Sequence, residues 1–155
     1  MTRWLAIALA VIALDQASKY AMAGWLVDGQ SIVVTSFFNL VLWHNTGAAF
    51  SFLAGAAGWQ RAFFIVIALI ATVWIALLLR KQTQFTLFGL ALALILGGAL
   101  GNLIDRIWLG AVIDFLDFHA ADWHWPAFNL ADSAITCGAA LMVWDSLKSP
   151  APGKS

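Results

Sequence analysis

The sequence predicts an all-α membrane protein with four transmembrane helices, and three observations lead to this fold class. The mean hydropathy is +0.87, and only 10% of the 155 residues are charged. A soluble domain of this size needs a more polar surface. Four apolar segments also approach the ~20 residues that cross a bilayer, and we assign the spans to residues 5–25, 62–79, 85–104 and 127–147. The length allows one domain, so we expect residues 1–155 to form a single integral membrane domain with a disordered tail at 149–155.

The first apolar segment has some features of a cleaved signal peptide. Arg3 precedes an apolar run, and Ala21-Met22-Ala23 has the small-x-small pattern of a cleavage site. Asp15 and Lys19 interrupt the supposed cleavage region, however, and further apolar segments follow. We therefore expect a retained helix.

The other three segments differ in character. Residues 62–79 are apolar at every position except Thr72, which is typical of a scaffold helix. The third segment carries Gly97 and Gly101, whose GxxxG spacing lets another backbone approach closely. The fourth segment begins after Pro126, a common residue at the start of a helix.

Basic residues predict the orientation of the spans. With four spans both termini lie on one side, where five basic residues flank the membrane against two on the other side: Arg3, Arg80, Lys81, Lys148 and Lys154, against Arg61 and Arg106. Because cytoplasmic loops carry the excess of Lys and Arg, we expect both termini in the cytoplasm. Most of the acidic residues then lie on or near the outer face.

Two connections remain on the outer side. Residues 30–43 contain SIVV and FFNLVLW, which are rich in β-branched and aromatic residues and predict a small extracytoplasmic β-sheet between the first and second helices. The NTGAAF stretch at 45–50 is expected to follow as a turn. Residues 107–125 are mixed and amphipathic, and we expect this outer segment between the third and fourth helices to lie in the membrane interface.

Acidic residues concentrate in one stretch of the chain. Five of the eight lie between Gly101 and Asp132, and all eight are aspartates. Asp15 lies near the middle of the first span, where a charged group costs about 2.5–3.5 kcal/mol, so it indicates either a functional site or a polar tie between helices. Lys19 follows four residues later on the same helical face and can neutralise Asp15.

Asn102 and Arg106 share a face at the outer end of the third span. A guanidinium group there can orient a carboxylate or a substrate carbonyl, and an arginine that snorkels at a helix end is the alternative. We expect Asp105 to brace these two residues. We expect Asp117 and Asp122 to be solvated residues of the interface.

Asp114 and Asp132 have the environments that an acid/base pair needs. Asp132 and Asn129 lie in the first turn of the fourth span, where the helix dipole favours an ionised carboxylate. Asp114 lies between apolar residues, and desolvation raises the pKa of a carboxyl group. One ionised and one protonated carboxyl can activate water and stabilise an oxyanion, as in an aspartic protease. On the residues alone Asp132 can also be a helix cap, and other acids compete as partners: Asp105, Asp117 and Asp122.

Other functions find less support in the sequence. The net charge is zero, so we expect no nucleic-acid partner. The three histidines, His44, His119 and His124, fit no zinc-ligand spacing, and we expect neither a metal nor a cofactor. Cys137 lies in an apolar run and is interpreted as a small buried hydrophobe. Two alternatives stay open: a small proton-coupled transporter, although no inverted repeat is visible, and a scaffold protein that associates through its GxxxG spacing.

Six short motifs follow one another from the first span to the fourth: Asp15-Gln16 with Lys19, Asn45-x-Gly47-Ala48-Ala49-Phe50, Gly58-Trp59-Gln60-Arg61, Gly101-Asn102-x-x-Asp105-Arg106, Gly110-x-Val112-x-Asp114-Phe115 and Phe128-Asn129-x-Ala131-Asp132. Through these motifs the chain resembles the bacterial lipoprotein signal peptidases, the type II signal peptidases, along essentially its whole length. Each motif alone is a weak signal, but all six in this order are specific.

The resemblance implies an aspartic endopeptidase of the bacterial inner membrane. Asp114 and Asp132 match the family's catalytic aspartates, and the residues that support the dyad or contact substrate match Asp15, Asn45, Asn102, Arg106 and Asn129. The implied substrates are prolipoproteins with a diacylglyceryl-modified cysteine, cleaved just before that cysteine. The site is then expected near the outer, periplasmic face, in contact with membrane lipids and beside a mobile outer segment. We expect the enzyme to be a monomer.

Overall fold

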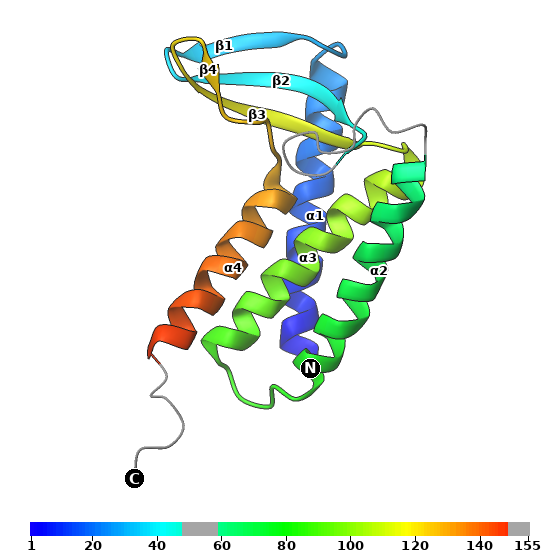
Figure 1. The fold of residues 1–155 in the computed structure, drawn as a ribbon, viewed down its shortest axis with the longest axis vertical. Coiled ribbons are helices and arrows are strands. Elements are labelled where there is room, and N and C mark those ends of the chain that lie inside the picture. Colours follow the sequence, from blue (N-terminus) through cyan, green and yellow to red (C-terminus); the bar gives the residue numbers. More distant parts are fainter. Residues whose placement is uncertain (48–58, 149–155) are drawn as a thin grey trace.

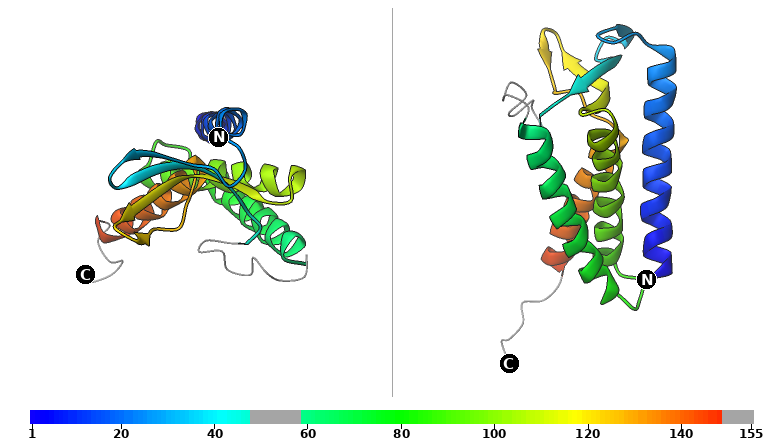
Figure 2. Two further views of the ribbon diagram at one scale, coloured as in Figure 1. Left: turned by 90° about the horizontal axis from the view of Figure 1, so that it is seen from above. Right: turned by 90° about the vertical axis from the view of Figure 1, so that its right-hand side faces the viewer.

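The computed structural model describes residues 1–47 and 59–148. These residues form a bundle of four helices with a small antiparallel sheet across one end (Figures 1 and 2). The helices are α1 (Thr2–Trp25), α2 (Trp59–Arg80), α3 (Leu87–Trp108) and α4 (Leu130–Lys148). The start of α1 and the end of α4 lie at the end of the bundle opposite the sheet. Positions 48–50 of the predicted turn, Gly58 of the third motif and the predicted tail at 149–155 lie outside the described residues.

Three of the described helices are long and apolar enough to cross a membrane: α1, α2 and α3. Large apolar side chains are exposed along α2, among them Phe63, Ile70 and Trp74. Such a surface suits the hydrocarbon core of a bilayer. The shorter α4 carries Asp132 and Asp145 and is not among these three helices.

The helix α3 extends further than the sequence indicates. It was expected to end near residue 104 but continues to Trp108. Arg61 of α2 supports this extra turn, because its Nε donates to the carbonyl of Arg106 at 3.0 Å and its guanidinium donates to the carbonyl of Ile107 at 2.8 Å. These carbonyls at the helix end would otherwise lack partners. Arg106 is therefore held inside a regular helix.

Small residues let α3 pack closely at the centre of the bundle, against each of the other three helices. A Cβ atom at Gly97 would lie 2.8 Å from the carbonyl oxygen of Ala8 in α1, and one at Gly101 would lie 2.5 Å from Oδ2 of Asp15. The close approach predicted from the GxxxG spacing is thus confirmed. It brings the polar residues of α1, Asp15 and Lys19, against the C-terminal half of α3.

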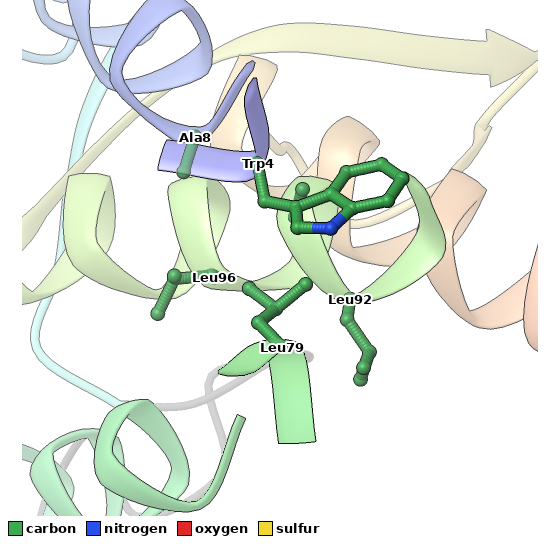
Figure 3. Close-up of a cluster of buried hydrophobic side chains, with 6 residues drawn as sticks. Trp4, Ala8, Leu79, Leu92 and Leu96 are labelled. Carbon is green, nitrogen blue, oxygen red and sulfur yellow. The ribbon is translucent and has the colours of Figure 1, made fainter. Parts of the chain in front are cut away.

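A buried apolar cluster joins α1, α2 and α3 at the end opposite the sheet (Figure 3). Trp4 is its largest member, is fully buried, and donates from its indole nitrogen to the carbonyl of Gln82 at 3.0 Å. The other members are Ala8, Leu79, Leu92, Ala93 and Leu96. Because lipid is as apolar as these side chains, the cluster stabilises the bundle through close packing.

The sheet has the strand order β1-β2-β3-β4, with neighbours antiparallel. Its strands are β1 (Ser31–Thr35), β2 (Phe38–Asn45), β3 (Val112–Ala120) and β4 (Trp123–His124). The predicted strands between the first and second helices are therefore confirmed. In the β2–β3 ladder Asn45 lies opposite Val112, and Trp43 lies opposite Asp114.

Residues 107–125 were expected to form an amphipathic segment in the membrane interface, and no strand was expected there. After the end of α3 these residues form β3 and β4, which extend the sheet. Asp114 and Asp117 are three residues apart, which would place them on one face of a helix, but on a strand this odd spacing places them on opposite faces. Pairing with β2, more than 60 residues earlier in the chain, decides between these conformations.

Candidate active site

Asp114 and Asp132 meet where the sheet joins the helix bundle. Asp114 is the third residue of β3 and is 3% exposed, whereas Asp132 is the third residue of α4 and is partly exposed. Both line one cavity of about 500 Å³. These two aspartates, which were predicted from the sequence as the acid/base pair, are the aspartates that line this cavity.

Polar and apolar side chains divide the lining of this cavity. The polar part contains the two aspartates together with Asn45, Asn102 and Arg106, and the apolar part contains Val112, Trp125, Phe128 and Ile135. The interpretation of Cys137 as a buried residue is wrong, because this side chain is exposed and lies on the α4 wall of the cavity. A site of this kind can bind a largely apolar ligand and orient one polar group.

Two amide groups hold the carboxyl group of Asp114. Asn129 Nδ2 donates to Oδ1 at 2.7 Å, and Asn45 Nδ2 donates to Oδ2 at 3.0 Å. Burial, and then the nearby Asp132 carboxylate, raise the pKa of Asp114 to about 7, while the two amides and the charge of Lys19 oppose this increase. Asp114 is therefore able to hold a proton near neutral pH.

Asp132 takes part in a capping box at the start of α4. Asn129 Oδ1 accepts from the backbone N–H of Asp132 at 2.9 Å, and Asp132 Oδ2 accepts from the backbone N–H of Asn129 at 3.3 Å. The other oxygen, Oδ1, accepts from Asn102 Nδ2 at 2.8 Å. The helix-cap interpretation of Asp132 is thus correct for one oxygen, and the same carboxyl group also lines the cavity.

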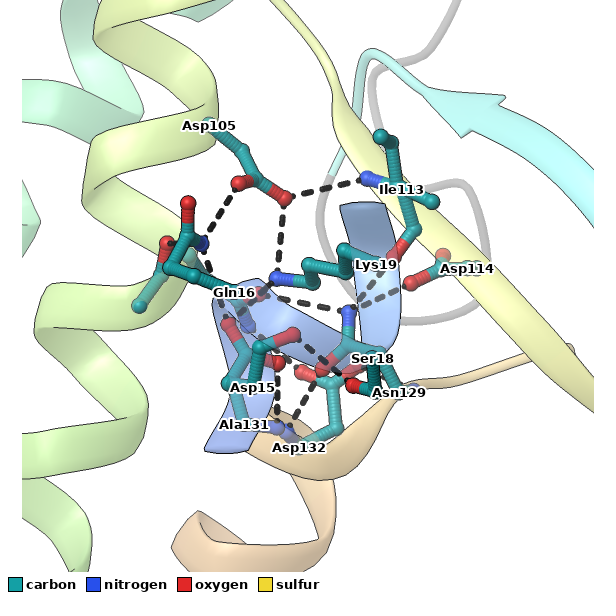
Figure 4. Close-up of polar contacts among 12 residues, drawn as sticks. Asp15, Gln16, Ser18, Lys19, Asp105, Ile113, Asp114, Asn129, Ala131 and Asp132 are labelled. Atoms are coloured by element: carbon teal, nitrogen blue, oxygen red, sulfur yellow. Dashed lines mark hydrogen bonds and ion pairs between the residues drawn. The ribbon is translucent and has the colours of Figure 1, made fainter. Parts of the chain in front are cut away.

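Asn129 links the two aspartates and is fully buried (Figure 4). Its amide nitrogen donates to Asp114 and also approaches the carbonyl of Ile113 at 3.1 Å and Oδ1 of Asn102 at 3.2 Å. Because this residue caps α4, the helix begins at Leu130, three residues later than the sequence indicates. One side chain therefore positions the helix and one of the acids together.

Arg106 contacts the loop that follows β2. Its guanidinium donates to the carbonyl of Gly47 at 2.9 Å and lies over the ring of Phe64 at 5.2 Å. Gly47 in turn donates its N–H to Oδ1 of Asn45 at 2.9 Å, as in an Asx turn. Arg106 thus holds the turn that carries Asn45, and it also lines the cavity.

Asp15 contacts the start of α4 from outside the cavity lining. It is fully buried, and its Oδ1 accepts from the backbone N–H of Ala131 at 2.9 Å. The predicted neutralisation by Lys19 is confirmed, since Nζ of Lys19 lies 2.8 Å from Asp15 Oδ2. Asp15 is not among the residues that line the cavity.

Two of the remaining aspartates depart from the predictions. Asp105 was expected to brace Asn102 and Arg106, but its carboxyl oxygens accept instead from Gln16, Lys19 and the backbone N–H of Ile113. The only sequence signal for these contacts was Lys19, a charged residue within a predicted transmembrane span.

Asp117 was expected to be solvated but is 1% exposed. It accepts from Asn39 Nδ2 at 2.8 Å and pairs with His124 Nδ1 at 2.9 Å. Pairing of β3 with β2 and β4 supplies both partners, and the sequence shows neither contact. Asp122 is exposed, as predicted. Across residues 1–47 and 59–148 there is no group of three His, Cys, Asp or Glu side chains arranged to hold a metal ion.

Sequence comparison identifies the relatives of this chain. The sequence model of signal peptidase (SPase) II matches residues 7–148. A lipoprotein signal peptidase of Janthinobacterium sp. (strain Marseille) is 55% identical over 148 residues, which cover 96% of this chain and 90% of that protein. One of Burkholderia vietnamiensis (strain G4 / LMG 22486) is 58% identical over 145 residues, 94% of this chain and 87% of that protein.

Two solved structures, both described as bacterial membrane enzymes, share the fold. One has a TM-score of 0.86 at 33% identity and covers all of this chain and 93% of its own. The other has a TM-score of 0.82 at 35% identity, covering 97% of this chain and 96% of its own. With a family match along nearly the whole sequence, the chain belongs to the signal peptidase II family of bacterial membrane hydrolases.

Proposed function

We propose that Asp114 and Asp132 form the catalytic dyad with which this signal peptidase II removes the signal peptide from prolipoproteins. The observation that carries this proposal is that both carboxyl groups line one cavity and are linked by the single buried side chain of Asn129. Other nearby acids, Asp105 and Asp117, are occupied by buried partners.

The surroundings of the two aspartates suit an exchange of one proton. Asp114 is the more deeply buried and keeps a proton near neutral pH, while Asp132 lies at a helix N-terminus, where a negative charge is favoured. Asp132 takes a proton from water as the water oxygen attacks the scissile carbonyl. Asp114 donates a hydrogen bond to the developing oxyanion. Collapse of the tetrahedral intermediate then breaks the peptide bond, and the amine that leaves takes up the proton.

The cavity also suits the lipid of the proposed substrate. A diacylglyceryl-modified cysteine presents two acyl chains, and Trp125, Phe128 and Ile135 offer apolar contacts beside the dyad. We propose that cleavage occurs just before this cysteine. Asn45, Asn102 and Arg106, on the polar part of the lining, then support the dyad or contact the peptide.

We further propose that all four helices span the inner membrane as a single domain, with both termini in the cytoplasm. The start of α1 and the end of α4 lie opposite the sheet, and the inner end carries Arg3, Arg80 and Lys81 (Figure 1). The dyad at the sheet end then lies near the periplasmic face, within reach of membrane lipids. We propose a monomer, because both aspartates and the amides that hold them belong to one chain.

Purified full-length protein in lipid nanodiscs, given a diacylglyceryl prolipoprotein, tests this function. Asp114→Asn and Asp132→Asn should each abolish release of the signal peptide while leaving the thermal unfolding transition near that of the wild type. Asp122→Asn, which changes an exposed acid in the same region, should cleave normally. Retained turnover in either dyad variant would refute the assignment.

A further inference from the structure

A buried ammonium group lies behind the proposed dyad, between α1, α3 and the start of α4 (Figure 4). Lys19 is 2% exposed, and its Nζ has three oxygen neighbours. These are Asp15 Oδ2 at 2.8 Å, Asp105 Oδ2 at 2.8 Å and Asn102 Oδ1 at 2.9 Å. All three donor positions of the ammonium group are thus matched by acceptors.

The two carboxylates paired with Lys19 each hold the backbone just before a dyad residue. Asp15 Oδ1 accepts from the N–H of Ala131 at 2.9 Å, immediately before Asp132 in the sequence. Asp105 Oδ2 accepts from the N–H of Ile113 at 3.2 Å, immediately before Asp114. One cation is therefore paired with both of the carboxylates that hold the backbone just before Asp132 and just before Asp114.

The third neighbour of Lys19 acts on the side chain of Asp132. Because Asn102 Oδ1 accepts from Lys19 and from Asn129, the amide is oriented with its Nδ2 toward Asp132 Oδ1 at 2.8 Å. If the amide rotated by half a turn, an oxygen would face the carboxylate. Lys19 and Asn129 thus together determine that Asn102 presents its nitrogen to Asp132.

We propose that Lys19 is a positioning residue of the peptidase, which holds both dyad aspartates in place through Asp15, Asp105 and Asn102. The inference rests on the proposed function, since it takes Asp114 and Asp132 as the catalytic pair. Lys19 is not among the residues that line the cavity, so it acts through these three neighbours and not on the substrate.

Removal of the ammonium group changes the site more than the fold. Without it, Asp15 and Asp105 face each other as buried carboxylates with no cation, which is a strongly unfavourable arrangement. Rearrangement of these side chains releases the N–H groups of Ala131 and Ile113. Contacts between α1 and α3 persist elsewhere, for example between Ala8 and Gly97 and around Trp4. Folding is therefore retained while the dyad loses its geometry.

Steady-state kinetics of Lys19→Met in nanodiscs test the inference. We expect kcat to fall about 100-fold, the effect of a displacement of about 1 Å at the reacting groups, with KM unchanged. Lys81→Met removes an exposed lysine at the opposite end of the bundle and serves as the matched control, with wild-type kcat and KM. Wild-type kcat in folded Lys19→Met, or a loss confined to KM, would overturn the inference.

Two further variants decide the outcome if Lys19→Met does not fold. Lys19→Gln keeps an amide donor toward one acceptor, and we expect it to fold, with lowered kcat and unchanged KM. Unfolding of this variant as well would assign Lys19 to folding and overturn the inference. We also expect that adding Asp105→Asn to the position-19 variant that folds lowers kcat little further, because the contact between Asp105 and the N–H of Ile113 is already lost. If the two substitutions instead lowered kcat by the product of their separate effects, Lys19 would not act through Asp105. If only this inference is wrong, Asp114→Asn and Asp132→Asn are still inactive. If the proposed function is wrong, at least one of these two variants is active.

Discussion

At the scale of single residues, Asp114 combines deep burial with hydrogen bonds to two amides. Burial favours its neutral form, and the amides of Asn45 and Asn129 favour its charged form. The balance keeps the pKa of Asp114 at about 7, which is the property that the proposed sharing of one proton with Asp132 requires. Such a pair titrates jointly, and pH profiles report on both acids together.

This balance predicts the pH dependence of the enzyme. Because the reaction uses protonated Asp114, kcat/KM should be high below pH 7 and fall as the pH rises through about 7. Asn45→Ala removes a donor that favours the ionised form, so it should raise the pKa and move the alkaline limb to higher pH. Rate profiles between about pH 5 and pH 9 measure this shift. A limb that stays in place, or moves to lower pH, would contradict the account, and Asp122→Asn should not move it.

At the scale of elements, the start of α4 serves structure and chemistry with the same residues. Asn129 caps the helix through its oxygen and holds Asp114 through its nitrogen. Asp132 completes the capping box and also faces the cavity. The two roles of Asn129 use different atoms, which makes them separable by substitution.

Asn129→Ser separates these roles, because a serine hydroxyl can still cap the helix but is too short to reach Asp114. We expect its unfolding temperature to stay near that of the wild type while kcat falls roughly 2–10-fold, the value of one hydrogen bond between neutral groups. Asn129→Ala should lose as much activity and also about 1 kcal/mol of stability. Equal stability of the two variants, or wild-type kcat in Asn129→Ser, would contradict this division.

The elements also show how far the sequence alone leads. Hydropathy, the GxxxG spacing and the aromatic strands predict α1 to α3 and the β1–β2 pair, because these signals are local. Motifs also lead to the proposal of Asp114 and Asp132 as the pair, and the structure places both on the lining of one cavity. The strand β3 is missed because its partner β2 is remote in sequence. The contacts of Asp105 and Asp117 are missed for the same reason, since Lys19 and Asn39 come from other elements.

At the scale of the whole molecule, we propose that the sheet and the two aspartates lie on the outer side of the membrane. The apolar surface of α2 and the positions of the helix ends support this arrangement. Among the described helices, α4 alone is not counted as long and apolar enough to cross a membrane, and Asp132 lies in its first turn. The side of the membrane on which each helix end lies therefore tests the proposed orientation of the protein.

Single cysteines introduced into a Cys137→Ala background should report this orientation. In intact cells, a maleimide that does not cross membranes should label Asp122→Cys on the β3–β4 turn, and it should not label Lys81→Cys or Lys148→Cys. All three positions are exposed in the structure, so permeabilised cells should give labelling of each. Labelling of Lys148→Cys from outside would show that α4 does not cross the membrane.

The turnover of Asp132→Asn tests the central claim most directly, because asparagine keeps one oxygen that can accept the capping N–H of Asn129, whereas the charge and the second acceptor, which faces Asn102, are lost. We predict that this variant binds the diacylglyceryl prolipoprotein with the affinity of the wild type and releases no signal peptide. Unchanged binding together with turnover near the wild-type rate would reduce Asp132 to a helix cap and contradict the dyad.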